Sequence, residues 1–518
     1  MRLPDILRRS ATFYRDRAAL VCESRRFTYG QFMERVNRLA DVLSASGTGP
    51  GDRVAVLLPN CHRFAELFLA VAQVGAVLVP LNIRLSPEEL AGLIEHSETV
   101  GLLSANPLRK TLRAMGNTLA KLKFLIGIDL EEEGFKDYEA LIEANRFSGR
   151  ELDFDDGGIA IQMYTSGTTG TPKGVLLTHR NLMANTLTGI FERRFTPQDV
   201  FLNAAPMYHI ADIEYFLQIL SVGGTNVFLE RFQPNLFLET VQKEKVTSTW
   251  IVPTMIYDLL AVFDPGRYDL SSLKTIFYGG ACLSPGLFWR AKKTLSCEFS
   301  LGFGLTEASP LVSMLRPEDH RGDPEGVERR LRSCGRKVFN VEVRIVDEEG
   351  REVPVGQVGE IVVRGANVMK GYWKMEGETR QALRGGWLHT GDMGRIDEEG
   401  YIFLVDRKKD VIKSGGENIY SREVEEAIAS HPAVEEVAVV GVPDERWGEA
   451  VKAVVVLREG AECSESEIHE SCRGKLAAFK QPKSISFVET LPKNITGKIL
   501  KAELRERYKQ ASGAPHEF

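Results

Sequence analysis

Several features are scarce or missing in this sequence of 518 residues. The 7 cysteines are scattered and form no Cys-x-x-Cys pair, and no two of the 9 histidines are close, so neither a disulfide framework nor a local zinc motif is expected. Neither sign of charge dominates: 65 basic and 71 acidic residues give a net charge of −6. This balance argues against nucleic acid as an overall partner.

Long apolar runs are missing as well. The longest covers residues 67–81, but Gln73, Gly75 and Pro80 interrupt it, so it is too short to cross a bilayer comfortably. It reads instead as a buried helix that passes into a strand. The N-terminus has no apolar stretch after its basic residues, so no secretory signal is predicted. A reduced, cytoplasmic protein without an integral membrane segment is expected.

The length of the chain and the alternation of its elements indicate a multidomain α/β protein. A chain of 518 residues exceeds what one core usually organises, and its 43% hydrophobic content can fill two or more. Thr28 and Gln31 have capping-box spacing ahead of a predicted helix, and Arg53 to Leu58 reads as a strand. Repeated alternation of this kind over the first 150 residues predicts α/β layers.

One stretch, Tyr164 to Val175, stands out chemically. A period-2 pattern predicts a strand just before it, and Leu176 to Ala184 reads as the opening of a helix. Glycines let backbone N–H groups converge on a polyphosphate, and hydroxyls and an ammonium add donors. Its candidate ligands are Thr165, Ser166, Gly167, Thr168, Thr169, Gly170 and Lys173. The spacing is not that of a P-loop, because Gly174 follows the lysine, and a mobile surface loop is the alternative.

Further candidates follow in the next 150 residues. Tyr208 and His209 precede an apolar helix that Asp212 interrupts, although His209 could be an ordinary histidine at a helix start. A buried strand, residues 273–278, ends in small residues that let a flat ligand approach, although a plain tight turn would have the same sequence. Phe303 can stack on a purine, and Glu307 can bind Mg²⁺ or be merely solvated. The neighbouring candidates are Ala211, Gly279, Gly280, Ala281, Gly302, Gly304 and Thr306.

The last third of the chain contains further candidate residues and a different pattern of predicted elements. Asp392 lies in a Thr-Gly-Asp string, and Arg407 opens a short charge run that alone would be a solvated face. After it, a helix over 422–430, which Ser421 can cap, and strands over 434–442 and 450–457 predict a small α+β unit. A tight loop contains Lys413, Gly415 and Gly416. Lys498 stands at the tip of a late loop, where a lysine is ordinarily a solvated surface residue.

Taken in order, these strings resemble six signatures of the adenylate-forming, AMP-binding acyl-CoA synthetases, the acid–CoA ligases. The resemblance covers nearly the whole chain and is strongest from Tyr164 to Lys498. It implies a large multi-layer N-terminal domain with α/β subdomains, residues 1–408, and a small mobile α+β C-terminal domain, residues 409–518, with a hinge near Lys409. Two departures are Asp212, where many CoA ligases have glycine, and Phe303, where the family often has tyrosine.

The resemblance also implies roles for these residues. Lys498, Lys173, Glu307 and His209 would be catalytic, Glu307 and Thr165 would serve Mg²⁺, and Lys498 would bridge carboxylate and α-phosphate. ATP would be held by the loop from Thr165 to Lys173 together with Gly280, Ala281, Gly302, Phe303, Gly304, Thr306, Asp392 and Arg407. The acid would lie against Tyr208, His209, Ala211, Gly279 and Gly280. Coenzyme A would meet Lys413, Gly415 and Gly416.

The function implied by the resemblance is an ATP-dependent acid:CoA ligase that forms acyl-AMP and pyrophosphate, and then acyl-CoA and AMP. A fatty acid of medium or long chain is the narrow preference, because the residues around the predicted pocket are largely apolar. The alternatives are an aryl-acid CoA ligase of the coumarate or benzoate type, an enzyme that loads a separate carrier protein, and a non-catalytic nucleotide-binding protein. A homodimer is a possible assembly.

Overall fold

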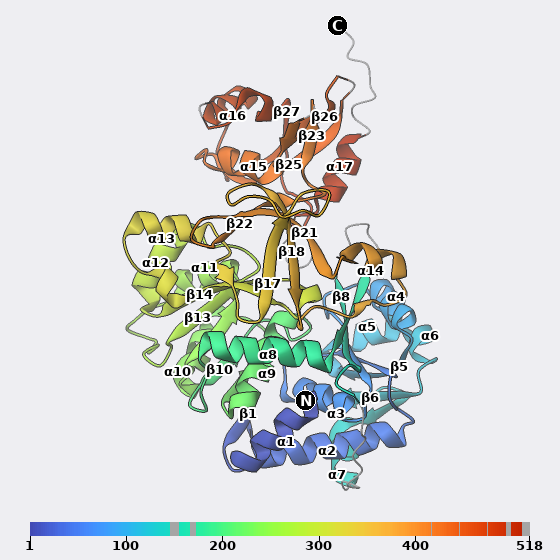
Figure 1. Cartoon of the computed structure of the whole chain (residues 1–518). Helices are drawn as coiled ribbons and strands as arrows, with labels where there is room; N and C mark the ends of the chain where they lie inside the picture. The colour runs from blue at the N-terminus through green and yellow to red at the C-terminus, as the bar shows by residue number, and fades with distance from the viewer. Residues whose placement is uncertain are drawn as a thin grey trace. The chain divides into compact units, whose positions relative to one another are not determined.

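The computed structural model describes residues 1–145, 155–165, 172–415, 417–444, 446–473, 475–493 and 499–509, and every structural statement concerns these residues. They form four β-sheets with helices on their faces, so the predicted α/β class is confirmed (Figure 1). The chain divides into two compact units. The first comprises Met1–Arg344, Val362–His389 and Glu399–Ile402, and the second comprises Ile345–Ile361, Thr390–Glu398 and Phe403–Phe518. The domain boundary expected at Lys409 stays a prediction.

The largest sheet of the first unit has nine strands. In spatial order these are β16 (Arg336–Lys337), β15 (Leu311–Leu315), β14 (Glu298–Gly304), β13 (Thr275–Gly279), β12 (Ser248–Ile251), β10 (Val200–Asn203), β11 (Thr225–Phe228), β1 (Ala18–Cys22) and β2 (Arg25–Thr28). The strands from β14 to β1 run parallel, and β15, β16 and β2 join antiparallel at the edges. Ligands of such sheets bind at the carboxyl ends of the parallel strands.

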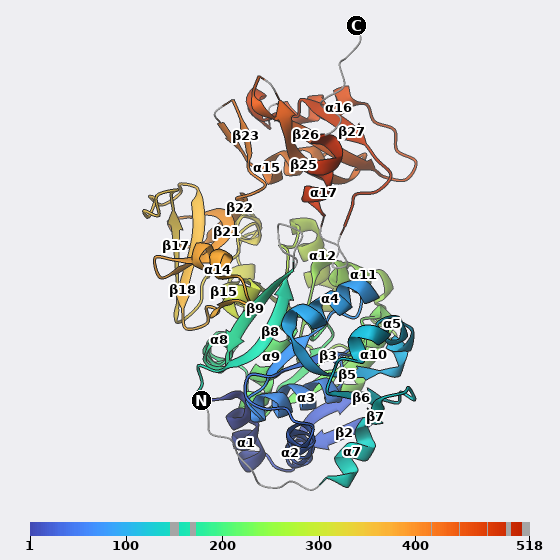
Figure 2. The same cartoon turned by 90° about the vertical axis from the view of Figure 1, so that its right-hand side faces the viewer.

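Eight strands form the second sheet. Their order is β19 (Gly371–Tyr372), β9 (Lys173–Thr178), β8 (Ile159–Thr165), β4 (Val77–Pro80), β3 (Arg53–Leu57), β5 (Thr99–Ala105), β6 (Phe124–Ile128) and β7 (Phe135–Asp137). Figure 2 shows β8 and β9 side by side, and they pair antiparallel. The run of residues 67–81 behaves as expected, because helix α3 (His62–Gln73) passes into β4.

The helix expected to open at Leu176 begins later. Residues 173–178 continue as strand β9, and helix α8 (His179–Arg193) starts only after Thr178, whose hydroxyl accepts a hydrogen bond from the Asn181 N–H at 3.1 Å. Gly174 to Thr178 are buried, so this strand shows a continuous apolar run and no alternation. A short run of this kind does not distinguish a strand from a buried helix, which explains the error.

Helices cover both faces of the nine-stranded sheet. On one face lies α9 (Ile210–Val222), whose Tyr215 ring stacks on the Phe201 ring of β10 with 4.9 Å between the ring centroids. Helix α8 packs beside α9. On the other face, Phe288 of α12 (Pro285–Leu295) contacts Phe299 of β14 at 5.7 Å. The remaining helices of the first unit are α1 (Leu3–Phe13), α2 (Tyr29–Ala45), α4 (Pro87–Ser97), α5 (Arg109–Ala114), α6 (Gly116–Leu119), α7 (Tyr138–Ala144), α10 (Pro234–Glu244), α11 (Pro253–Val262), α13 (Pro324–Leu331) and α14 (Glu376–Ala382). The capping box expected at Thr28 is present at the start of α2.

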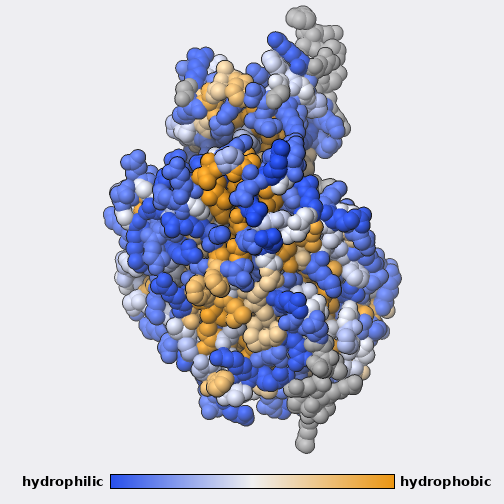
Figure 3. Space-filling view, in the orientation of Figure 1, coloured by the Kyte–Doolittle hydropathy of each residue, from blue (hydrophilic) through white to orange (hydrophobic). Residues whose placement is uncertain are grey.

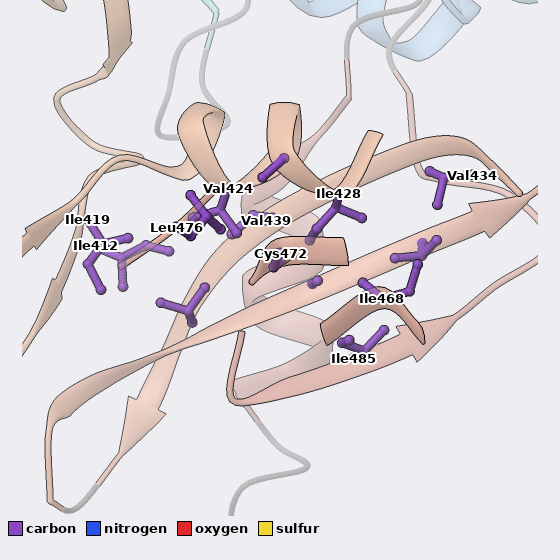
Figure 4. Close-up of a cluster of buried hydrophobic side chains, with 14 residues drawn as sticks. Ile412, Ile419, Val424, Ile428, Val434, Val439, Ile468, Cys472, Leu476 and Ile485 are labelled. Carbon is purple, nitrogen blue, oxygen red and sulfur yellow. The ribbon is translucent and has the colours of Figure 1, made fainter. Parts of the chain in front are cut away.

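Two smaller sheets complete the fold. One has the order β17 (Val341–Val346), β18 (Gly359–Gly365), β21 (Trp387–Ile396) and β20 (Leu383–Arg384), with β22 (Ile402–Arg407) on β21. The other, in the second unit, has the order β24 (Glu417–Ile419), β23 (Ile412–Ser414), β26 (Gly448–Leu457) and β25 (Val434–Asp444), with β27 (Ser484–Phe487) on β26. Helices α15 (Ser421–Ala429) and α16 (Glu465–Cys472) pack against each other, and α17 (Lys501–Lys509) packs on β25. Figure 4 shows the aliphatic core of this unit.

Two properties of the surface concern the sequence-based expectations. Among the described residues, no helix has the length and apolar character needed to span a membrane. Apolar side chains nevertheless reach the surface in the region of α8 (Figure 3), where Leu187 and Phe191 are 54% and 63% exposed. The Phe191 ring lies 5.0 Å from that of Phe339, which is equally exposed. The homodimer considered above stays a prediction.

Candidate active site

The glycine-rich loop connects the two strands of a hairpin. Thr165, at the end of β8, is opposite Lys173, at the start of β9, so both flanks of the loop are fixed by the antiparallel pairing. The other candidates in the loop, Ser166, Gly167, Thr168, Thr169 and Gly170, lie outside the described residues. The hairpin thereby places Lys173 at a defined strand end of the second sheet, at the start of β9.

One aromatic side chain links two of the predicted catalytic residues. The Lys173 Nζ lies over the Tyr372 ring at 5.0 Å from its centroid, and the Tyr372 hydroxyl donates a hydrogen bond to Glu307 Oε1 at 2.9 Å. All three side chains are half-buried. Burial and the nearby Glu307 carboxylate raise the pKa of Tyr372, so its phenol keeps its proton and acts as a donor.

Backbone bonds keep this cluster together. The Met369 N–H donates to the Glu307 carbonyl at 2.8 Å, and the Trp373 N–H donates to the Gly174 carbonyl at 2.8 Å. The short strand β19, which contains Tyr372, therefore bridges the Glu307 turn and β9. Tyr372 is absent from the residues singled out in the sequence. Its local signal is a Gly-Tyr-Trp string, but nothing in that string indicates contact with Glu307.

Glycines remove side chains at the carboxyl ends of β13 and β14. Gly279 is opposite Gly302 in the parallel pairing, and a Cβ on Gly304 would stand only 2.0 Å from the Pro310 carbonyl oxygen. Gly280 has a φ of +79°, a conformation that disfavours other residues. Close packing within the protein therefore leaves no room for a side chain at Gly304, and the approach of a ligand to this end of the sheet stays a prediction. Ala281 and Gly280 are exposed there, and Phe303 and Thr306 are half-buried.

The predicted acid-binding residues lie at the start of α9. His209 is its N-cap residue, Tyr208 is 7% exposed, and Ala211 is half-buried in the first turn. Burial, assisted by the charge of Arg84, lowers the pKa of His209 to about 4. The imidazole is therefore neutral near neutral pH, and it can offer one donor and one acceptor but no charge.

Asp212, in the same turn, is fully buried. Neither of its carboxylate oxygens has a hydrogen-bond partner among the described residues. Burial raises its pKa well above the usual value, because an isolated charge in an apolar setting is costly. The carboxyl therefore holds its proton.

In the second unit, Asp392 and Arg407 form an ion pair. The Arg407 Nε lies 2.8 Å from Asp392 Oδ1, and Asp392 is 4% exposed. The next residue, Lys408, pairs with Glu360 at 2.9 Å. Carboxylates on β21 and β18 thus bind the two neighbouring cations, Arg407 and Lys408.

Lys409 follows directly and is exposed. The residue after it, Asp410, pairs with Arg505 of helix α17. Asp406 accepts hydrogen bonds from the N–H and the hydroxyl of Ser421, so it satisfies the first turn of α15. Ser421 was expected to be the cap itself. Instead it is the first residue of the helix, and its own N–H is the group that is capped.

A tight loop follows in β23 and β24. Gly415 has a φ of +60°, and its N–H donates to the Trp447 carbonyl at 2.8 Å. A Cβ on Gly415 would stand 2.8 Å from the Trp447 ring, which is 39% exposed. Lys413 is exposed beside them, whereas Gly416 and Lys498 lie outside the described residues.

The donor set fits Mg²⁺ of the kind that nucleotides carry. No cluster of three or more His, Cys, Asp or Glu side chains in the described residues could hold a metal by itself. Mg²⁺ commonly uses one or two carboxylates and completes its shell with phosphates and waters. Glu307, with one oxygen oriented by Tyr372, supplies a carboxylate of this kind.

Comparisons with known proteins define the class. The sequence signature of the AMP-binding enzymes matches residues 7–373, and that of the AMP-binding enzyme C-terminal domain matches residues 423–498. A feruloyl-CoA synthase of Amycolatopsis sp is 40% identical over 495 residues, which cover 93% of this chain and 94% of that protein. The long-chain-fatty-acid–CoA ligase FadD13 of Mycobacterium tuberculosis is 36% identical over 489 residues, which cover 93% of each chain.

Among solved structures, ATP-bound MatB from Rhodopseudomonas palustris matches with a TM-score of 0.86 and 31% identity, over 99% of this chain and 100% of that chain. The matched fold combines a large N-terminal and a small C-terminal domain of mixed α/β structure, as expected. The chain is thus an adenylate-forming enzyme. It belongs to the AMP-binding enzyme family, within the AMP-forming acyl-CoA synthetases, and the resemblance stated from the sequence is confirmed.

Proposed function

We propose that the protein joins a carboxylic acid to coenzyme A in two steps. The carboxylate attacks the α-phosphorus of ATP, which gives acyl-AMP and releases pyrophosphate. The thiolate of coenzyme A then attacks the acyl carbon, which gives the thioester and releases AMP. The single observation that carries this proposal is the cluster of Lys173, Tyr372 and Glu307, because it joins an ammonium on the phosphate loop to a carboxylate suited to Mg²⁺.

The roles of the residues follow from their chemistry. In both steps charge develops on oxygens, so fixed cations and donors lower the barrier most. Lys173 would bind the departing pyrophosphate, and Glu307 would hold Mg²⁺, which neutralises phosphate charge when bound. Asp392 can accept two hydrogen bonds from a ribose diol, with Arg407 holding it in place at 2.8 Å. Lys498 remains the proposed bridge between carboxylate and α-phosphate.

The acceptor side of the proposal concerns the second unit. Trp447 offers an exposed aromatic face beside the Gly415 loop, with Arg446 at 4.7 Å and Lys483 at 5.9 Å from its ring centroid. An aromatic face with two cations suits the adenine and phosphates of coenzyme A. Lys413 and Gly416 stay predictions at this place. A separate carrier protein as acceptor is the second candidate.

Two classes of acid are candidates for the substrate. The sequence favoured a fatty acid because the pocket residues are largely apolar, and an aryl acid was the alternative.

The experiment supplies ATP, Mg²⁺ and coenzyme A with a mixed pool of fatty and aryl acids. Pyrophosphate release reports the first step, and mass spectrometry identifies any thioester. We expect both products, and Glu307→Gln serves as the control that loses pyrophosphate release. Absence of pyrophosphate with every acid would refute the proposal, whereas pyrophosphate without thioester would move the acceptor to a carrier protein.

A further inference from the structure

The last turn of helix α4 lies against the hairpin of β8 and β9 that carries the glycine-rich loop (Figure 2), and the proposed reaction gives this turn no role. In this turn, His96 Nδ1 lies 2.7 Å from the Tyr164 hydroxyl. The two rings meet edge to face, with 5.7 Å between their centroids. Tyr164 stands directly before Thr165 at the end of β8, so the contact reaches the strand that enters the loop.

The backbone of His96 is connected to the other flank of the loop. Its carbonyl accepts a hydrogen bond from the Trp373 indole N–H at 3.0 Å. The Trp373 backbone N–H donates in turn to the Gly174 carbonyl at 2.8 Å. Gly174 is opposite Tyr164 in the antiparallel pairing, and the next pair contains Lys173. One residue of α4 is therefore linked to both strands at the point where the loop leaves the sheet.

Close packing holds Trp373 in this position. Arg53, at the start of β3, stacks on its ring, with the guanidinium Cζ 3.6 Å from a ring centroid. A Cβ on Gly174 would stand 3.3 Å from Trp373 Cβ, so the strand and the indole are in direct contact. Lys374 pairs with Glu98 at 2.7 Å, but both side chains are about half exposed and this pair adds little.

The Tyr164 hydroxyl is held between two partners. It accepts a hydrogen bond at 3.0 Å from Nε2 of Gln162, a fully buried residue of the same strand. Burial and the charge of Lys374 lower the pKa of His96, so its imidazole is neutral near neutral pH and Nδ1 can accept the phenol proton. Burial raises the pKa of Tyr164 to about 12, so the phenol keeps this proton. A chain of donors from Gln162 through Tyr164 to His96 thus fixes the hydroxyl.

We propose that His96 is a positioning residue for the adenylation step and acts through Tyr164 on the glycine-rich loop. The inference rests on the proposed ligase function. Adenylation requires the departing pyrophosphate to stay in line with the attacking carboxylate, and a displacement of about 1 Å can lower such a rate about a hundredfold. Attachment of both flanks to one turn of α4 keeps the two ends of the loop in place. Thioester formation releases AMP and no pyrophosphate, so it does not need this support.

The test measures the two half-reactions separately in Tyr164→Phe, His96→Leu and His96→Asn. The first is pyrophosphate release at saturating ATP and Mg²⁺, with the acid whose thioester the mixed pool yields. The second is thioester formation from the corresponding acyl-AMP and coenzyme A.

We expect pyrophosphate release to fall about tenfold in Tyr164→Phe and His96→Leu, because each removes the same hydrogen bond. Thioester formation, and ATP affinity measured by calorimetry without acid, should stay within about twofold of wild type. His96→Asn keeps an acceptor oxygen near the position of Nδ1, so its pyrophosphate release should stay within about threefold of wild type. In a double-mutant cycle, His96→Leu should add little to Tyr164→Phe.

Tyr268→Phe is the matched control, because Tyr268 is 5% exposed and its hydroxyl donates to Asn235 at 3.1 Å, far from α4 in sequence. Both half-reactions should keep their wild-type rates in this variant. Unchanged pyrophosphate release in Tyr164→Phe and His96→Leu, equal loss of both half-reactions, or equal losses in His96→Asn and His96→Leu would overturn the inference and leave the ligase standing. If the wild-type enzyme released no pyrophosphate with any acid, the proposed function itself would fail.

Discussion

Replacing Tyr372 by phenylalanine removes one hydroxyl and keeps the ring beneath Lys173. The lost bond runs from the phenol to Glu307 Oε1 at 2.9 Å, and the acceptor is a carboxylate. Hydrogen bonds to charged groups contribute about 1.5–3 kcal/mol, and Tyr372 is only half-buried, so water can replace part of the bond. We therefore expect the lower end of that range, which is about a tenfold change in an equilibrium constant.

The affected equilibrium is the orientation of Glu307 for Mg²⁺. The assay measures pyrophosphate release at fixed ATP over a Mg²⁺ titration, and the half-saturating Mg²⁺ concentration should rise about tenfold in Tyr372→Phe. Binding of Mn²⁺, followed by electron paramagnetic resonance with ATP present and the acid omitted, gives a readout that does not depend on turnover. Tyr372→Leu also removes the ring and should add a loss in ATP affinity through Lys173, which lies 5.0 Å from the ring centroid.

Tyr257→Phe is the matched control, because this tyrosine is 57% exposed on α11. A double-mutant cycle separates the hydrogen bond from general damage, since Tyr372→Phe should have little further effect in a Glu307→Gln background. An unchanged Mg²⁺ requirement in Tyr372→Phe, or full additivity in the cycle, would refute the coupling between Tyr372 and Glu307.

Three further predictions follow from the site. Lys173→Ala should still bind ATP, measured by calorimetry, while pyrophosphate release falls, because the backbone donors of the loop remain; full adenylation activity would make the loop structural. Lys498→Ala should abolish acyl-AMP formation but leave thioester formation from supplied acyl-AMP largely intact. Lys409→Pro should fix the proposed hinge, so it should keep acyl-AMP formation and lose thioester formation. Equal loss of both half-reactions in both variants would exclude domain rotation. Asp212→Asn should raise the melting temperature more at about pH 8 than at about pH 5. Because the pKa of Asp212 is raised in the folded state, the wild-type protein loses stability as pH rises above the unfolded pKa of about 3.9, and asparagine removes that loss. An equal gain in melting temperature at both pH values would contradict the burial argument.

Local patterns were enough to predict much of the fold. The capping box at Thr28 and the strand beginning at Arg53 depend on neighbours in sequence, and both are present. The helix predicted to open at Leu176 was wrong because the burial of this residue depends on a segment distant in sequence. That residue is buried because β9 lies between β8 and β19, and β19 comes from residues 371–372. Its surroundings are therefore set by a distant segment, which no local pattern can reveal.

The candidate site likewise contains residues that stand in local motifs and contacts that only the folded chain creates. Lys173, Glu307 and the glycines of β13 and β14 stand in recognisable strings, so the sequence alone proposed them as site residues. Tyr372 is linked to Glu307 across 65 positions, and no pattern announces that hydrogen bond. The Arg193–Glu214 pair likewise appears only when two helices pack, because each residue alone reads as an ordinary charge.

Asp212 shows how burial can reverse an interpretation made from residue type. By residue type alone, a carboxylate beside the predicted acid pocket could pair with the ammonium group of an amino-acid substrate. The structure buries it completely, without a hydrogen-bond partner among the described residues, and burial raises its pKa. A protonated, enclosed carboxyl offers no negative charge to an ammonium group. An amino-acid substrate therefore finds no counter-ion in Asp212, and the choice of an acid without an ammonium group stays a prediction.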